Sequence, residues 1–238
     1  GSHAEYLVLP EGGVAILPEG LTFADAASAG VPYTTAAEAL DRLELGGQDR
    51  LLILGSGAVG MAAAALARHR GTDPLIAVQT RDNVRACEAA GFAAAFSPED
   101  KPLPSGFKAI FDTTGHRLPE SIEALGKFGK VAIIAAPPGG TVEAPVLALY
   151  RKGGSIIGVN SLLHDSTECA RMLEKIAPAL KSPLAGPAAM QVPIEKAVEA
   201  YAALGAGDRT KFVFSMPACS DARNSIKKEK CDDQRSGS

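Results

Sequence analysis

Short apolar runs alternate with helix-type apolar patterns along most of this chain, and this alternation constrains its fold more than any other feature. Several of the apolar runs lack polar residues, as expected for strands buried on both faces of a parallel sheet. The predicted strands span residues 50–54, 74–78, 93–96, 109–113, 130–136, 154–159 and 211–215. The predicted helices span residues 58–69, 81–90, 118–128, 144–152, 166–180 and 194–204. The order predicts an α/β fold with a doubly wound parallel sheet.

The two ends of the chain have a different pattern. Residues 4–10 and 14–18 resemble two short strands, and residues 24–43 resemble a helix interrupted around residues 30–32. We therefore expect three parts: an N-terminal appendage over 1–48, the main domain over 49–216, and a C-terminal tail over 217–238, mostly mobile.

Composition and charge exclude several functional classes. The formal net charge of −3 gives no electrostatic footprint for general binding to nucleic acid or to an anionic membrane. The four cysteines form no C-x-x-C pair, and their scatter fits a reducing compartment. With neither a membrane-length apolar run nor a signal peptide, a cytoplasmic protein is expected.

A glycine-rich turn at residues 55–60 is the strongest local signal. Gly55, Gly57 and Gly60 form G-x-G-x-x-G directly after an apolar strand and directly before an Ala-rich helix. The first glycine permits a tight turn, the second lets a pyrophosphate approach, and the third lets helix and strand pack closely. The free N–H groups at the helix start, where Ala58 and Val59 lie, attract phosphate. This context indicates a dinucleotide-binding Rossmann fold.

The rival interpretation of this turn is a methyltransferase, which also opens with a Gly-rich turn after its first strand. The acidic residue usual just before that turn is absent here, where Ile53 and Leu54 stand.

The end of the second predicted strand bears on the choice between NADP and NAD. Gln79 occupies the place where an NAD-binding protein usually has a carboxylate for the ribose 2′-OH. Thr80 and Arg81 follow, and they suit hydrogen bonding and charge pairing to a 2′-phosphate, which favours NADP. Two alternatives stay open: Thr80 as a simple helix cap with Arg81 solvated, and Asp82 as the acceptor for NAD.

Six segments together resemble the medium-chain dehydrogenase/reductase family, which includes zinc alcohol dehydrogenases, quinone oxidoreductases and enoyl reductases. The similarity covers nearly all of residues 1–216 and lies in the order and spacing of the segments. The matching segments are GSHAEYLVLP (1–10), LPEGLTFADAA (17–27), GVPYTTAAEAL (30–40), FDTTG (111–115), GKFGKV (126–131) and YRKGGSIIG (150–158).

The chain departs from that family in its metal and substrate parts. Most of the family's N-terminal substrate domain has no counterpart, so residues 1–48 would be its remnant and no catalytic residue can be assigned. Val31 stands where zinc alcohol dehydrogenases have a metal-ligating cysteine, and the structural-zinc cysteines are missing. The resemblance therefore implies a zinc-independent reductase without a metal site. His69, His116 and His164 lie in unrelated segments and are expected at the surface or at helix ends.

The resemblance also implies further cofactor contacts. Thr35 would lie near the nicotinamide, and the strand end at Thr113 would border the cofactor. Ala135, Ala136 and Pro137 would meet the carboxamide through backbone groups, although residues 137–140 also suit a plain turn. Val159 and Asn160 would close over the same ring. Tyr33 has a hydroxyl near this region, and a buried packing role suits it equally.

The resulting hypothesis is an NADP(H)-dependent oxidoreductase that transfers hydride to an activated C=C or C=O of a small-molecule substrate. The alternative is a non-catalytic or excised dinucleotide-binding module that acts with another domain. The uncharged strand over 154–159 also predicts a homodimer formed by edge pairing, as in the resembled family, unless the tail or N-terminal strands cover that edge.

Overall fold

The computed structural model describes residues 3–4, 6–96, 102–208 and 210–216 of the chain. The contacts divide it into two compact units. One is Pro10–Ala188, and the other joins Gly1–Leu9 to Ala189–Ser238. The domain boundaries predicted at residues 48 and 216 stay a prediction, and the expected tail over 217–238 lies outside the described residues.

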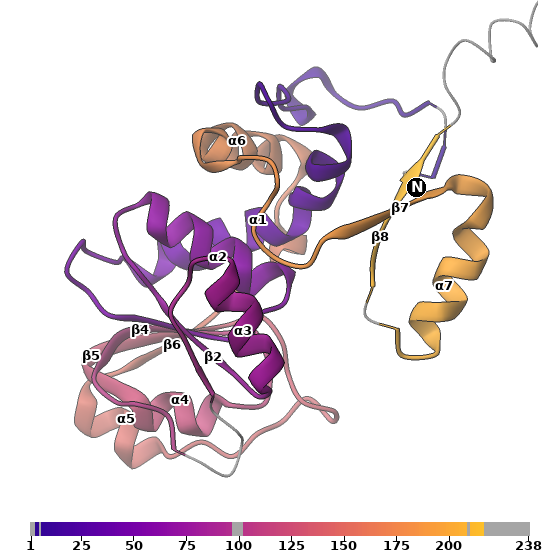
Figure 1. Cartoon of the computed structure of the whole chain (residues 1–238). Coiled ribbons are helices and arrows are strands. Elements are labelled where there is room, and N and C mark those ends of the chain that lie inside the picture. Colours follow the sequence, from indigo (N-terminus) through magenta and orange to yellow (C-terminus); the bar gives the residue numbers. More distant parts are fainter. Residues whose placement is uncertain (1–2, 5, 97–101, 209, 217–238) are drawn as a thin grey trace, which may run out of the picture. The chain divides into compact units, whose positions relative to one another are not determined.

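The larger unit is built on a six-stranded parallel sheet with the order β3-β2-β1-β4-β5-β6 (Figure 1). This order and the parallel pairing are those of the doubly wound Rossmann fold, which confirms the predicted fold class. The strands are β1 (Leu51–Leu54), β2 (Leu75–Val78), β3 (Ala94–Phe96), β4 (Phe107–Asp112), β5 (Leu125–Ile133) and β6 (Ser155–Gly158).

Helices cover both faces of this sheet, and each face has its own apolar core. Leu51 and Ile53 of β1 point into the core on one face, whereas Leu52 and Leu54 point into the other. The first core is formed with α1 (Phe23–Leu43), α2 (Ala58–His69), α3 (Arg81–Ala89) and α6 (Ser166–Ile176). The second is formed with α4 (Leu118–Ala124) and α5 (Val146–Lys152), which lie together beneath the sheet in Figure 1.

Helix α1 runs without interruption through Pro32, so the predicted break around residues 30–32 is wrong. Proline removes one helical hydrogen bond and costs roughly 3 kcal/mol in a helix interior. The packing of α1 against α2 offsets this cost, because Ala29, Tyr33, Ala36 and Leu40 are all buried in the shared core. Tertiary packing therefore outweighs the local breaker.

The predicted helix over 118–128 is too long, since α4 ends at Ala124 and β5 begins at Leu125. Two glycines explain this early start of the strand. A Cβ at Gly126 or Gly129 would lie 3.3 Å or 2.9 Å from the carbonyl oxygen of Phe107, so glycine alone lets the chain lie this close to β4. The strand also ends at Ile133, earlier than the predicted residue 136.

The ends of two other helices differ from their predicted bounds because of prolines. Helix α6 gives way to η3 (Ala177–Ala179) at Pro178, and α5 begins only after Pro145. The missing N–H of Pro178 removes a hydrogen bond that α6 needs to continue. Pro145 is the N-cap of α5, and a proline disfavours a helical conformation for the residue before it, Ala144. The two predicted N-terminal strands are also wrong. Among residues 3–4 and 6–18 the structure has only the short turn η1 (Glu11–Gly13), and Val8 is 95% exposed.

The smaller unit contains a sheet of its own. Strand β8 (Lys211–Ser215) pairs in parallel with β7 (Ala189–Pro193), and η4 (Ile194–Lys196) and α7 (Ala197–Gly205) connect the two. The expectation that residues 211–215 join the main sheet is therefore wrong, and β7 was not foreseen. Within this unit His3, Tyr201 and Phe214 form an aromatic cluster, in which Tyr201 Oη lies 3.1 Å from His3 Nε2.

The helices of the described residues include no segment that is both long enough and apolar enough to cross a membrane.

Candidate functional site

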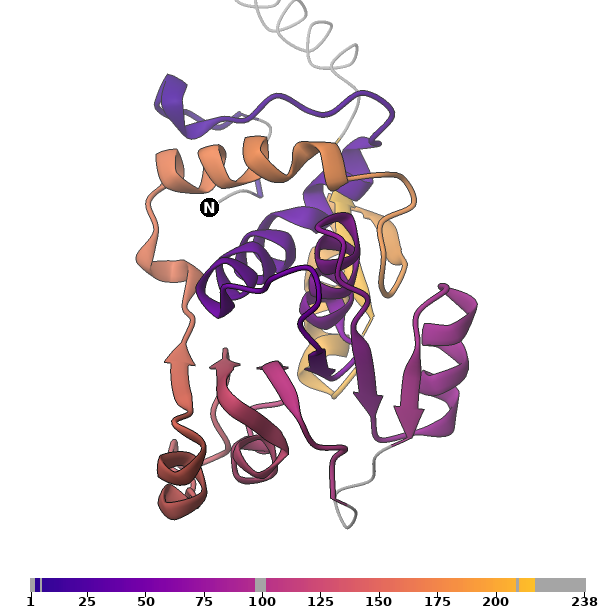
Figure 2. The ribbon, with the colours of Figure 1, turned by 90° about the vertical axis from the view of Figure 1, so that its left-hand side faces the viewer.

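The glycine turn predicted as a phosphate cradle joins β1 to α2 at the carboxyl end of the sheet (Figure 2). Gly55 has a φ of +99°, a conformation that L-residues rarely adopt. A Cβ at Gly60 would lie 2.1 Å from the Gly55 carbonyl oxygen, so any side chain there would push the helix away from the strand. Both glycines are therefore required by the backbone itself.

Gly57 has a different role, because it lies in open space. No heavy atom lies within 4 Å of an added Cβ, and its backbone (φ −70°, ψ −176°) suits any residue. Gly57 is the N-cap of α2, where no side chain caps the helix and no acidic residue stands in the first turn. The first N–H groups, over Ala58 and Val59, face an open approach that an anionic group can use. A pyrophosphate fits this cradle.

The neighbouring strand end completes the crevice. In a doubly wound sheet ligands bind where the strand order reverses, which here is between β1 and β4. Thr113, just after β4, donates its hydroxyl to the Leu54 carbonyl oxygen at 2.6 Å and thereby ties the two strand ends together. Asp112 is fully buried and accepts hydrogen bonds from the backbone N–H and the hydroxyl of Thr114, which fixes the turn that follows.

The structure brings the other predicted strand-end loops to the same edge. A Cβ at Gly115 would lie 2.8 Å from Ala135 Cβ and 3.0 Å from the backbone nitrogen of Ala136, so the loops after β4 and β5 are in contact. Ala135 and Ala136 are exposed, and Pro137 is half-buried. The backbone N–H of Val159 donates to the Ile133 carbonyl oxygen at the end of β5, so the loop after β6 begins beside the loop after β5.

At the end of β2 the helix-cap interpretation of Thr80 is confirmed. Its hydroxyl oxygen accepts from the Asn83 backbone N–H at 3.2 Å and thus caps α3. The hydroxyl keeps its own proton to donate. Arg81 is exposed, and its guanidinium carbon lies 4.8 Å from the centre of the Phe96 ring. Gln79 Nε2 lies 3.3 Å from His116 Nε2, a contact that the sequence did not suggest.

Thr35 and Tyr33 are both buried in α1. Burial raises the pKa of the Tyr33 hydroxyl, which also hydrogen-bonds to the Ala185 backbone. This burial fits the packing interpretation of Tyr33.

The residues do not fit a zinc ion. Val31 is exposed on α1 and has no metal-binding atom. Over the described ranges, no three His, Cys, Asp or Glu side chains are grouped closely enough to hold a metal.

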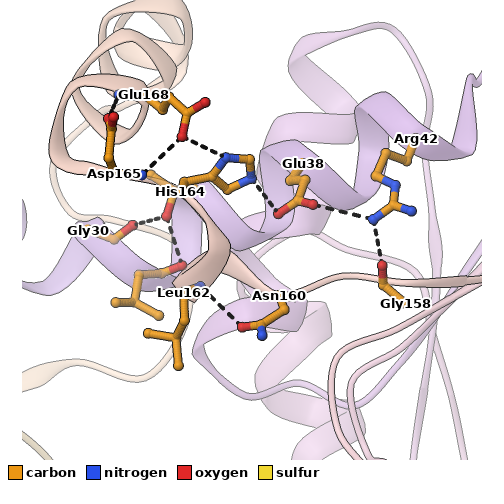
Figure 3. Close-up of polar contacts among 11 residues, drawn as sticks. Gly30, Glu38, Arg42, Gly158, Asn160, Leu162, His164, Asp165 and Glu168 are labelled. Carbon is orange, nitrogen blue, oxygen red and sulfur yellow. Dashed lines mark hydrogen bonds and ion pairs between the residues drawn. The ribbon is translucent and has the colours of Figure 1, made fainter.

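Sequence reasoning missed a charged cluster beside the loop after β6. Glu38 on α1 lies between Arg42 of the same helix and His164 in that loop, and His164 also contacts Glu168 on α6 (Figure 3). Their wide separation in the chain gave no local signal.

Comparisons with known proteins agree with this geometry. Residues 58–177 match the zinc-binding dehydrogenase family. The chain is 34% identical, over 184 residues, to a zinc-type alcohol dehydrogenase-like protein from Schizosaccharomyces pombe. That alignment covers 74% of this chain and 54% of the yeast protein. The chain thus spans about half the length of this curated relative.

Two solved structures share the fold. The quinone oxidoreductase of Thermus thermophilus, also determined in complex with NADPH, has a TM-score of 0.71 at 28% identity. That likeness covers 86% of this chain and 69% of the other. The Bacillus subtilis protein yhfP with NAD bound has a TM-score of 0.66 at 23% identity, covering 82% and 64% of the two chains.

The open surroundings of Gly57 lead to a direct prediction. Gly57→Asp should fold normally, because its backbone suits any residue, yet lose dinucleotide binding, because a carboxylate would repel the pyrophosphate. Isothermal titration calorimetry should show affinity about 100-fold weaker, roughly 2.7 kcal/mol, because the carboxylate would stand where the pyrophosphate binds. Gly47→Asp, before β1, where an added Cβ also meets no atom, is the matched control and should bind as the parent does. Undiminished binding by Gly57→Asp would show that the cradle is wrongly assigned.

Proposed function

Since the chain belongs to the medium-chain dehydrogenase/reductase family, we propose that it is an NADP(H)-dependent oxidoreductase that acts without zinc. The substrate would be a small molecule with an activated C=C or C=O. The observation that supports this most is the glycine cradle between β1 and α2, beside the crevice between β1 and β4. Its open N-cap at Gly57 fits a pyrophosphate. When bound, the nicotinamide would supply the hydride.

The chain's own residues would bind and orient the cofactor. The N–H groups at the start of α2, at Ala58 and Val59, would hold the pyrophosphate next to Gly55, Gly57 and Gly60. The nicotinamide end would lie at the sheet edge toward β6. This edge is lined by Thr113, Ala135, Ala136, Pro137, Val159 and Asn160. Thr35 is buried in the adjacent helix α1 and would line the nicotinamide end from the side of the core. No side chain is proposed to carry out the proton transfer.

The experiment that tests the activity is a steady-state assay of NADPH oxidation with a quinone and with an enoyl compound, beside a direct binding titration. Binding together with turnover is expected. Binding without turnover would favour the alternative, a dinucleotide-binding module acting with a separate substrate domain. Absence of binding would contradict both.

The preference for NADP over NAD is proposed to depend on Gln79, Thr80 and Arg81. Gln79 brings no carboxylate to compete with a 2′-phosphate, and Thr80 retains a hydroxyl proton to donate. Arg81 stacks on Phe96, which holds an always-charged guanidinium beside the end of β2.

Arg81→Ala should weaken NADPH binding by about 1–3 kcal/mol, as expected for a hydrogen bond to a charged group, and leave NADH binding almost unchanged. Calorimetric titration of both cofactors measures this directly. Arg85→Ala, another exposed arginine of α3, is the matched control. Equal losses for NADPH and NADH would show that Arg81 does not recognise the phosphate.

A homodimer is proposed through β6, which lies at the edge of the six-stranded sheet. The strand has no charge and no proline, and Ile156 is 38% exposed. The N–H of Val159 points to β5, so alternation directs the N–H of Ile157 to β5 as well and that of Ile156 outward. Ile156 is therefore the residue that can pair with a second copy.

Ile156→Pro removes the outward N–H while sparing the bonds to β5, so it should convert a dimer into a monomer. Ile156→Thr keeps the N–H and should stay dimeric. Sedimentation velocity at micromolar concentration distinguishes the two states. A monomeric parent protein would refute edge pairing.

A further inference from the structure

The loop after β6 is held on α1 by a cluster of charged side chains. We call residues 159–165 the β6–α6 loop. Arg42 on α1 donates a hydrogen bond to the carbonyl oxygen of Gly158, directly before this loop. Glu38, one helical turn earlier, lies 3.4 Å from Arg42 Nη1 and 3.2 Å from His164 Nε2 at the end of the loop (Figure 3). One face of α1 thus contacts the loop at both of its ends.

His164 lies between two carboxylates. Its Nε2 faces Glu38 Oε2 at 3.2 Å, and its Nδ1 faces Glu168 Oε2 at 3.5 Å. These are close polar contacts, because neither Glu38 Oε2 nor His164 Nε2 has a hydrogen-bond partner among the described residues. The Glu38 side chain is only 12% exposed and that of His164 only 25%, so water screens their attraction less than at an open surface. Removing either group would leave the other poorly solvated.

The Glu168 carboxylate also fixes the start of α6. The Glu168 side chain accepts from the backbone N–H of Asp165 at 2.9 Å, and Asp165 accepts from the N–H of Glu168 at 2.8 Å. This capping box ends the loop at a defined position. Helix α1, the loop and the start of α6 are therefore connected through Glu38, His164 and Glu168.

Inside this frame the loop presents Asn160 at the edge of the sheet where the nicotinamide end of the cofactor is proposed. Asn160 Oδ1 accepts from the Leu162 backbone N–H at 3.1 Å, which leaves the side-chain amide N–H groups to donate to a ligand. Asn160 is exposed and follows the buried Val159. The position of Asn160 depends on how firmly the loop is held.

We infer that Glu38 and His164 are positioning residues, which hold the β6–α6 loop and Asn160 against the nicotinamide half of the dinucleotide. This inference rests on the proposed function, because it requires that the site bind a nicotinamide dinucleotide. It adds that the affinity for the nicotinamide half depends on a contact between two side chains that do not touch the ligand.

Comparing the binding of two ligands distinguishes a positioning role at the nicotinamide half from a role in the stability of the whole fold. NADPH extends along the whole site, whereas 2′-phospho-ADP-ribose has the same adenine end and pyrophosphate but no nicotinamide. Glu38→Ala and His164→Ala should each weaken NADPH binding by about tenfold, within the range measured for two side chains in contact. Binding of 2′-phospho-ADP-ribose should change less than about twofold. The double variant should lose no more than either single one, because both remove the same interaction.

Two further variants make the comparison specific. Glu38→Gln keeps an oxygen that can accept from His164, so it should recover part of the NADPH affinity. Glu123→Ala on α4 removes a carboxylate from another ion pair, with Lys152, and should bind both ligands as the parent does. Amide hydrogen exchange without ligand should be faster across the β6–α6 loop in Glu38→Ala than in Glu123→Ala.

The outcomes are distinct. If the parent binds neither ligand, the proposed function fails, and with it this inference. If the parent binds NADPH but Glu38→Ala and Glu38→Gln both bind it equally well, only the positioning role fails. Equal losses for NADPH and 2′-phospho-ADP-ribose would also contradict it, because the contact between Glu38 and His164 would then support the fold as a whole.

Discussion

The close contact between β1 and α2 at Gly60 is the constraint on which the site depends. A side chain at residue 60 would meet the Gly55 carbonyl at 2.1 Å, so helix and strand can lie this close only around a glycine. This packing points the start of α2 at the crevice between β1 and β4. It also sets the place of α1, which packs on α2 and carries Thr35, Glu38 and Arg42. Glu38 and Arg42 contact His164 and Gly158, so the β6 end of the crevice is held by α1.

The crevice has two ends with different chemistry. At the β2 end, Thr80 caps α3 and Arg81 stacks on Phe96, so a positive charge stands over an exposed surface. At the β6 end, backbone loops and Asn160 form the edge, and the charged groups Glu38, Arg42 and His164 hold this end of β6 and its loop. The first end suits recognition of a phosphate, and the second suits the orientation of a neutral ring. Such a division is what a dinucleotide with one anionic and one reactive half requires.

Local sequence signals predicted the parts of this molecule that local physics determines. The apolar strands and the glycine spacing gave the sheet and the cradle, because burial on both faces and close backbone approach each demand particular residues. The predictions were wrong where contacts between residues far apart in the sequence determine the local structure. The continuity of α1 through Pro32 depends on α2, and the strand at Leu125 depends on the approach of Gly129 to Phe107. Similarly, residues 211–215 form a strand as predicted but pair with β7, since a strand's apolar pattern does not specify its partner.

The candidate site was predicted only in part for the same reason. Its glycines and strand ends follow from motifs, whereas Glu38 and His164 meet only because α1 crosses the loop after β6. An isolated histidine in sequence gives no hint of two carboxylates around it. Contacts of this kind become visible only once the sheet has brought its connections together.

The central claim is that a nicotinamide dinucleotide lies across the carboxyl edge of the sheet, with its pyrophosphate at the start of α2. Amide chemical-shift mapping by NMR during titration with NADP tests this most directly. The largest shifts should fall on residues 55–60 and on the strand ends at Thr80, Thr113 and Asn160. Shifts confined to other surfaces, or none at millimolar NADP, would contradict the claim.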